Sequence, residues 1–330
     1  MSLVDLLVAL TIVGLAVALV LPALNAQTEQ KRQLSCSNNL KVIGLAIQNF
    51  HDIRQEICPS YLTTDLTTFA PTGHAAWPIL LMPYLEHGKE YDRFDLAQPV
   101  GQDAKTATVD HAAARTTSLA TYFCSARRVP PQLTTDKSGT VGDYGNVSYG
   151  LAGKGADPSK PQTYNGAMMV CRVFNASDKV NSEAISPFKA ATLGPRDFRA
   201  MTTFASVLDG LSNTAFFAEK AAHADRLGQA DSAGSHQDGT FYYGSGGAKA
   251  GQSAFTHPGA MAFWSRRLGA ENETTPLLPK EPKSEDPNNR FGSWHPKVTL
   301  FSLGDGSVKW VYHTTSNTVL ERFGARNDRQ

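Results

Sequence analysis

The sequence predicts an α+β protein in which one long N-terminal helix packs on a mainly antiparallel β domain with long loops. Two observations predict the helix: an uncharged apolar run at residues 6–24, and a one-sided apolar pattern that continues it to residue 52. A third predicts the sheet, because short β-rich runs alternate with turn residues from residue 53 onward. We therefore expect an apolar helix half at 1–28, an amphipathic half at 29–52 and a globular domain at 53–330.

Composition excludes two classes of protein. The 330 residues carry 31 Lys and Arg against 30 Asp and Glu, a formal net charge of +1, and 41% of them are hydrophobic. A wholly disordered chain would be poorer in apolar residues and more strongly charged. A strongly basic nucleic-acid binder needs a net positive field to attract phosphates. No nucleic-acid partner is expected.

The apolar run Leu6–Leu24 is as long as a membrane span. As a helix it would extend roughly 28 Å, about the thickness of a bilayer hydrocarbon core. A signal peptide and a plain membrane anchor are alternatives, but no basic residue precedes the run. Asp5 weakens both alternatives, because a carboxylate one turn into an apolar helix is costly. Asp5 either sits at the headgroup boundary or pairs with the α-ammonium of Met1, its own or a neighbour's.

The first residues, M-S-L-V-D-L-L-V-A-L-T-I-V-G-L-A-V, resemble the start of a mature type IV pilin or type II secretion pseudopilin. The resemblance implies that prepilin peptidase cuts a basic leader and that the new N-terminus at Met1 is often methylated. It also implies that Asp5, where Glu is usual, neutralises the amine of an adjacent subunit during assembly. Gly14 and Pro22 match the places where the pilin helix loosens, in keeping with their weak helix propensity. Because no leader precedes position 1, either the numbering begins at the processed end or the start codon is misplaced.

The second half of the helix has one apolar face. Its side chains recur at steps of 4, 3, 4 and 3: Cys36, Leu40, Ile43, Ile47 and Phe50. That spacing marks one side of a helix, which we expect to pack on the sheet. We predict a single helix of about 50 residues, roughly 75 Å long, with Pro22 as its weak point. The alternative is an anchor followed by a separate helix, with a break near Asn25.

Five segments in order carry a second resemblance, over nearly the whole chain: S-C-S-N-N-L-K-V-I-G-L-A-I-Q-N-F-H-D (Ser35–Asp52), A-A-W-P-I-L-L-M-P-Y-L-E (Ala75–Glu86), Y-F-C-S (Tyr122–Ser125), S-V-L-D-G-L-S-N-T-A-F-F-A-E (Ser206–Glu219) and W-H-P-K-V-T-L-F-S-L-G-D-G-S-V-K-W (Trp294–Trp310). They are similar to a bacterial family of prepilin-like proteins with a C-terminal H-x(9)-D-G motif. The motif residues here are His295, Asp305 and Gly306. The fold that both resemblances imply is pilin-like.

The C-terminal motif predicts a hairpin over 298–313. Val298–Leu303 and Val308–His313 are β-rich, and the Gly-Asp-Gly-Ser sequence between them is typical of a tight turn. Val308, Trp310 and Tyr312 would share one face of the second strand. The residues from 321 onward are interpreted as a polar tail.

The spacing of His295 and Asp305 bears on what the motif does. If the intervening residues are extended, the two lie about 30 Å apart, at ~3.3 Å per residue. They would then stand at opposite ends of one strand. We interpret the motif as a strand with a fixed start and a fixed turn, not as a catalytic dyad.

Four cysteines allow three disulfide pairings. An exported domain would lie in an oxidising compartment, where disulfides persist. Cys36 lies on the helix face expected to be buried and Cys124 in a family motif, so we favour Cys36–Cys124 as a link between helix and sheet. Cys58–Cys171 would be the second bond, and buried thiols are the alternative. Without a C-x-x-C pair a structural zinc site is not expected.

No enzyme or cofactor is expected. The chain has no H-E-x-x-H, G-x-S-x-G, Walker or G-x-G-x-x-G motif. Asp209 and Asn213 could place oxygens around Ca²⁺, as a pseudopilin loop does, but such a run is more often a plain turn.

Three functions remain open. The preferred one is a structural subunit of a type IV pilus-like filament at the bacterial cell surface, reached through an inner-membrane-anchored periplasmic precursor. Its partners would be further copies of itself, the inner membrane, prepilin peptidase and the assembly machinery. The alternative is a pseudopilin that forms a periplasmic piston. The third is a membrane-anchored periplasmic enzyme or binding protein, which would need a polar site such as Glu219 with a histidine.

Overall fold

The computed structural model describes most of the helix, the sheet and the segments around them. The described residues are 2–63, 74–101, 111–135, 137, 139–148, 166–168, 171–172, 198, 200, 202–229, 238, 241–242, 266–267 and 291–326, without the side chains of 19–26, 63, 171–172, 266–267 and 321. Met1 lies outside them. So do Leu151–Thr163, Gly244–Ser253 and Ala270–Asn289, three stretches rich in small, polar or proline residues.

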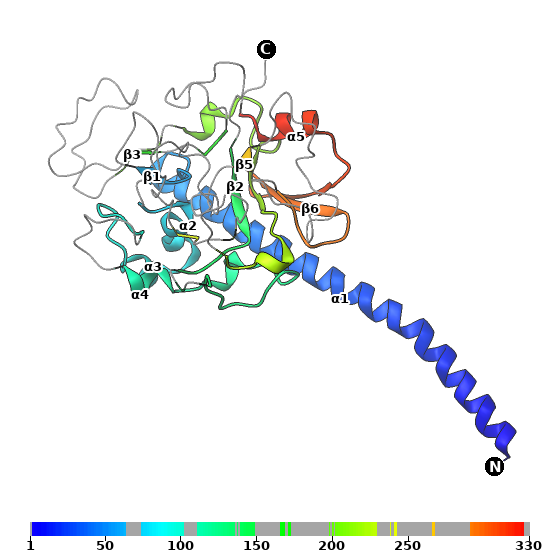
Figure 1. Ribbon diagram of the computed structural model, residues 1–330. Helices are drawn as coiled ribbons and strands as arrows, with labels where there is room; N and C mark the ends of the chain where they lie inside the picture. Colours follow the sequence, from blue (N-terminus) through cyan, green and yellow to red (C-terminus); the bar gives the residue numbers. More distant parts are fainter. Residues whose placement is uncertain are drawn as a thin grey trace, which may run out of the picture.

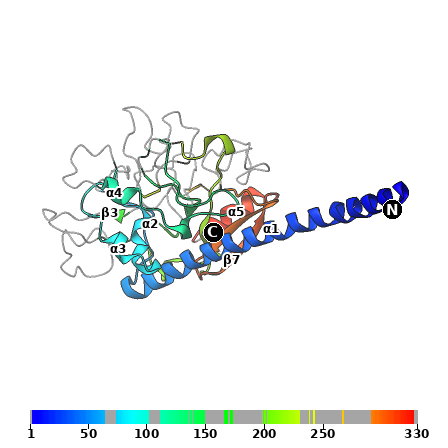
Figure 2. The same cartoon turned by 90° about the horizontal axis from the view of Figure 1, so that it is seen from below.

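A single helix, α1 (Leu3–Arg54), forms the N-terminal part of the chain. It continues through Pro22, so the prediction of one helix is confirmed and the alternative with a break near Asn25 is wrong. Its first half projects from the globular part, and its second half lies along one side of it (Figures 1 and 2). The helix ends at Gln55, whose φ of 58° is left-handed and stops the helical repeat.

The sheet is mainly antiparallel, as predicted. Its strand order is β5-β2-β4-β6-β7, and β5 alone pairs in parallel, with β2. A separate parallel pair joins β1 to β3. The strands are β1 (Leu62–Thr63), β2 (Tyr144–Ser148), β3 (Cys171–Arg172), β4 (Ala215–Glu219), β5 (Arg266–Arg267), β6 (Val298–Leu303) and β7 (Val308–Tyr312).

The globular domain also contains helical turns, so its described part is less β-rich than predicted. They are α2 (Trp77–Leu80), η1 (Met82–Leu85), α3 (Gly88–Tyr91), α4 (Ala112–Arg115), η2 (Ala120–Tyr122), η4 (Phe204–Ser206), η5 (Ala224–Arg226) and α5 (Asn317–Gly324). Most of these turns lie between the strands; α2 and α3 lie near the C-terminal end of α1, whereas α5 lies beside β6 (Figures 1 and 2).

The C-terminal segment corrects one prediction. The residues from 321 onward belong in part to helix α5 and are not simply a polar tail. Leu320 is buried beside Phe301, and Phe323 packs on the same cluster, so two apolar side chains suffice to dock the helix. The predicted hairpin is confirmed, because β6 and β7 pair from Val298 opposite Tyr312. In β7, Trp310 and Tyr312 are exposed.

The apolar face of α1 is buried against the sheet, as predicted. Four side chains are at most 1% exposed: Leu40, Ile43, Ile47 and Phe50. They join Trp77, Phe217 and Leu300 in one core. Each such side chain contributes about 1.5–3 kcal/mol when it leaves water. Burial along this face is therefore the main attachment of the helix.

Helix and hairpin approach most closely at Gly44. A Cβ built on Gly44 would lie 2.7 Å from the Ser302 hydroxyl and 2.9 Å from the Gly306 Cα. Gly306 itself needs its left-handed φ of +80° to close the hairpin turn. The Gln48 side-chain amide donates a hydrogen bond to the Gly304 carbonyl from the next turn of the helix. The turn of the H-x(9)-D-G motif is thus seated directly on α1.

We predict that Gly44→Ala lowers the free energy of unfolding by about 1–2 kcal/mol. The new methyl group overpacks the contact with Gly306, which costs more than the helix gains from alanine. Urea denaturation of the full chain measures the change. Gly14→Ala is the matched control, since no atom lies within 4 Å of its Cβ position. Equal effects of the two substitutions would contradict the close packing at Gly44.

Candidate functional site

The first half of α1 exposes apolar side chains on every side. Between 50% and 75% of the surface is accessible for ten of them: Leu3, Val4, Leu6, Leu7, Val8, Leu10, Ile12, Val13, Leu15 and Val17. Soluble monomers rarely expose a contiguous apolar surface of this kind, so it marks an interaction site. No helix within the described residues is long and apolar enough to cross a membrane.

Asp5 caps the start of its own helix. Its carboxylate accepts the Ser2 N–H at 2.8 Å, and the Ser2 hydroxyl accepts the Asp5 N–H at 3.2 Å. This reciprocal capping box satisfies two backbone donors that the helix leaves open. The sequence had suggested a headgroup position or an amine partner, and the cap is a third role. The Met1 amine lies outside the described residues.

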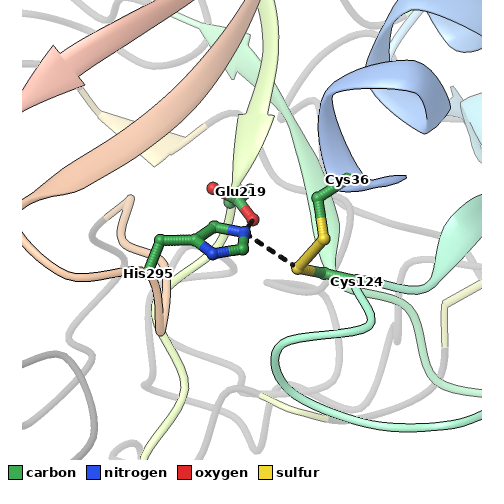
Figure 3. A group of neighbouring side chains, drawn as sticks. All are labelled: Cys36, Cys124, Glu219 and His295. Carbon is green, nitrogen blue, oxygen red and sulfur yellow. Dashed lines mark hydrogen bonds and ion pairs between the residues drawn. A yellow bond between two sulfur atoms is a disulfide. The ribbon is translucent and has the colours of Figure 1, made fainter. Parts of the chain in front are cut away.

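Four residues from separate segments meet where α1 crosses the sheet (Figure 3). Cys36 comes from α1, Cys124 from the turn after η2, Glu219 from the end of β4 and His295 from the segment before β6. One donor atom from each lies within 4.8 Å of the others. All four residues are buried. We call this group the helix–sheet cluster.

The predicted disulfide Cys36–Cys124 is confirmed. Its two Cα atoms lie 5.0 Å apart, and the bond joins positions 88 residues apart in sequence. Closing a loop of that length removes entropy from the unfolded chain, which stabilises the fold by about 4–5 kcal/mol in the simple model. The bond ties the middle of the helix to the segment that leads into the sheet.

The second predicted disulfide, Cys58–Cys171, falls partly outside the described residues. Cys58 is buried, and its Sγ lies 3.5 Å from the Pro59 carbonyl oxygen. The pairing of β1 with β3 sets Cys171 opposite Leu62, four residues beyond Cys58. The side chain of Cys171 lies outside the described residues.

His295 is held between two carboxylates. Its Nδ1 lies 2.6 Å from the Glu29 carboxylate of α1, and its Nε2 lies 3.5 Å from both the Glu219 carboxylate and the Cys124 Sγ. Burial lowers the pKa of His295, but the hydrogen bonds and charges of Glu219 and Glu29 raise it more, so the net pKa lies above 6.5. When it is protonated, His295 supplies positive charge to both acids.

The H-x(9)-D-G segment contacts α1 at both of its ends. His295 contacts Glu29 at one end of β6, and the turn at the other end rests on Gly44. Asp305 accepts hydrogen bonds from the Ser307 N–H at 2.9 Å and from its hydroxyl at 2.6 Å, which fixes the turn. The interpretation of the motif as an anchored strand is confirmed.

The pairing of Glu219 with a histidine does occur, but the site is closed. The side chains of Glu219 and His295 are both 0% exposed. The remaining carboxylate oxygen of Glu219 accepts the Leu300 N–H at 3.0 Å. With both side chains buried, the pair links the end of β4 to the segment before β6.

A buried ion network fixes the turn that carries Cys124. Asp143 accepts the Cys124 N–H at 2.8 Å and pairs with Arg127 and Arg128 at 3.0 and 2.6 Å. Arg128 also bonds Asp238 through both of its terminal nitrogens, at 2.6 and 2.8 Å. Burial tends to raise the pKa of Asp238, but Arg128 and Lys220 hold it far below its ordinary value. No spacing in the sequence indicated this network.

The calcium candidate is a turn in the structure. The Asn213 side-chain amide donates to the Asp209 backbone carbonyl at 3.0 Å, and Gly210 supplies a left-handed φ of +89°. These contacts are typical of a loop that amide side chains stabilise. They favour the plain-turn interpretation.

The fold and the cluster together define a class: an α+β protein whose long N-terminal helix is anchored by a disulfide on an antiparallel sheet. The chain belongs to the family SBP_bac_10, described as "protein of unknown function (DUF1559)", whose model matches residues 27–318. No curated protein and no solved structure matches the chain.

We predict that His295→Gln lowers the free energy of unfolding by about 3–5 kcal/mol at neutral pH, because it leaves buried Glu219 without a positive partner. Adding Glu219→Gln removes the unpaired charge and restores part of the loss. A double-mutant cycle by urea denaturation measures this coupling. Strictly additive losses would show that the two side chains act independently.

We predict that the Asp238 network makes the fold sensitive to acid. Since the pKa of Asp238 is depressed in the fold, its stabilising effect is present above the ordinary value of 3.8 and is lost as pH falls below it. Asp238→Asn should destabilise the chain at pH 7 and flatten the pH dependence below pH 4. Asp225→Asn, at a side chain 89% exposed, is the control and should leave both unchanged.

Proposed function

We propose that this protein is a structural subunit of a type IV pilus-like filament, assembled through the first half of α1. The observation that supports the proposal is the set of ten exposed apolar side chains that surround this half. Each gains about 1.5–3 kcal/mol on full burial, so packing such helices together yields a large driving force. The globular domains would then coat the outside of the bundle.

The carboxylate of Asp5 would set the stagger between subunits. In the helix half it stands among apolar side chains, where an unpaired charge is costly once neighbouring helices exclude water. The α-amine of a neighbouring subunit would neutralise it, in place of its bond to the Ser2 N–H. Gly14 and Pro22 would loosen the helix within the bundle.

The uncharged apolar run at residues 6–24, whose last side chains lie outside the described residues, would hold the precursor in the inner membrane before assembly. Prepilin peptidase would cut the leader there, and the assembly machinery would extract the subunit into a filament at the cell surface. A pseudopilin in a periplasmic piston would use the same contacts, and the length and location of the filament distinguish the two. A role as an enzyme or binding protein is disfavoured, because Glu219 and His295 are closed off by α1.

We predict that Asp5→Ala leaves a folded, membrane-inserted monomer but reduces the sheared filament yield at least about tenfold, the effect of losing 1.4 kcal/mol per contact. The yield is measured in the fraction sheared from intact cells, with cryo-electron microscopy of any filaments. Long filaments of the wild type support the pilus. Wild-type protein that forms only short cell-bound assemblies favours the piston.

Ser2→Ala is the matched control for this experiment. It removes the hydroxyl of the capping box but keeps the Asp5 carboxylate. If Asp5 acts only as a cap, both substitutions weaken assembly equally. If Asp5 pairs with a neighbouring amine, Ser2→Ala retains most of the filament yield. Normal yield from Asp5→Ala would sink the proposed contact.

A further inference from the structure

The helix–sheet cluster has a second chemical state. Reduction of the Cys36–Cys124 disulfide would place two thiols beside His295 and Glu219 (Figure 3). Two thiolates, an imidazole and a carboxylate form a donor set that suits Zn²⁺. We propose that the reduced chain binds one Zn²⁺ through Cys36 Sγ, Cys124 Sγ, His295 Nε2 and Glu219 Oε1.

The distances in the cluster fit a tetrahedral site. With Zn–S bonds of about 2.3 Å and Zn–N or Zn–O bonds of about 2.0–2.1 Å, the ligand atoms of such a site lie about 3.3–3.8 Å apart. His295 Nε2 already lies 3.5 Å from both Cys124 Sγ and Glu219 Oε1. The two sulfurs, bonded to each other in the oxidised state, separate once the disulfide is reduced. The backbone need not move far, because the Cα atoms of the two cysteines lie 5.0 Å apart.

The groups around the cluster orient two of the ligands. Glu29 lies 2.6 Å from His295 Nδ1, which directs Nε2 toward the sulfurs. A carboxylate on the far nitrogen is the usual support of a metal-binding histidine. The Leu300 N–H donates to Glu219 Oε2, while the buried Glu219 Oε1 makes no hydrogen bond among the described residues and faces His295 Nε2 at 3.5 Å. A metal ion between them would bind both of these atoms directly.

The reaction balances with a dithiol reductant of the cytoplasm, where thiols are kept reduced before the chain is exported. Two electrons from the reductant convert the disulfide to two thiols, and the reductant becomes a disulfide. Binding of Zn²⁺ then releases one proton from each thiol, and a third from Nε2 where His295 is protonated. A disulfide oxidant reverses the process by thiol–disulfide exchange: it takes two electrons from the thiolates and becomes a dithiol, while the metal is released and the Cys36–Cys124 bond is restored. Either state keeps α1 attached to the sheet, through zinc or through sulfur.

The test uses the full chain, oxidised or reduced with a phosphine, and Co²⁺ as a spectroscopic probe. The reduced protein should bind one Co²⁺ per chain with thiolate charge-transfer and tetrahedral d–d absorption, which Zn²⁺ then displaces. The oxidised protein should show neither band. Cys58→Ser is the matched control and should leave both bands intact. Equal metal binding by the oxidised and reduced chains would overturn the proposal.

Two variants separate ligation from folding. Glu29→Gln keeps all four ligands but loosens His295, so the affinity for Zn²⁺ should fall about 10–100-fold. Cys36→Ser combined with Cys124→Ser should abolish binding. Near-ultraviolet circular dichroism of the buried aromatic residues reports whether each reduced chain is folded. If the reduced wild type is unfolded, Zn²⁺ should refold it and not the double variant; failure to refold would also overturn the proposal.

Discussion

The structure depends on the docking of the second half of α1 against the sheet. Apolar burial of one helix face supplies most of the energy, but burial is not directional and would tolerate a shifted helix. Two contacts remove that freedom. The helix–sheet cluster fixes α1 at Cys36 and Glu29, and the contact between Gly44 and Gly306 fixes it about two turns beyond Cys36. Strand β6 joins the two points, so helix and strand hold each other in register.

Buried charged side chains fix the relative positions of the segments around the disulfide. A buried ion pair is a weak source of net stability, because desolvation offsets most of its attraction. Here the buried charges come in satisfied groups: His295 between two acids, and Asp143 between two arginines. Both groups border Cys124, through the His295 contact and through its own backbone N–H. Their positions determine how the disulfide meets the helix, a role that apolar side chains of equal volume would not fill.

Features encoded locally could be predicted from the sequence, and those assembled from distant segments could not. The buried helix face follows from apolar residues spaced three to four positions apart, and the hairpin strands follow from an alternation with a period of two. Both patterns are visible among residues close together in the sequence. The disulfide Cys36–Cys124 was predicted because Cys36 lies on the expected buried helix face and Cys124 lies in a segment that resembles a family motif. The bond from Glu29 to His295 spans 266 positions, and no pattern indicates it. No sequence pattern indicates the pairing of Asp143 with its two arginines either. The role of Gly44 is equally hidden, because it depends on a hairpin far along the chain.

The two halves of α1 serve separate purposes, and the rigid helix connects them. The family match begins at residue 27, shortly before Glu29, whose carboxylate contacts the globular domain. It therefore covers the docked half and the domain, and it does not cover the exposed apolar half. At 1.5 Å per residue, Asp5 lies about 36 Å along the helix from Glu29, too far for the described groups that contact Glu29 to neutralise it. In the proposed assembly its partner comes from another molecule. Helix docking and the proposed subunit assembly are consequently expected to be separable by mutation, since a change in one half leaves the contacts of the other in place.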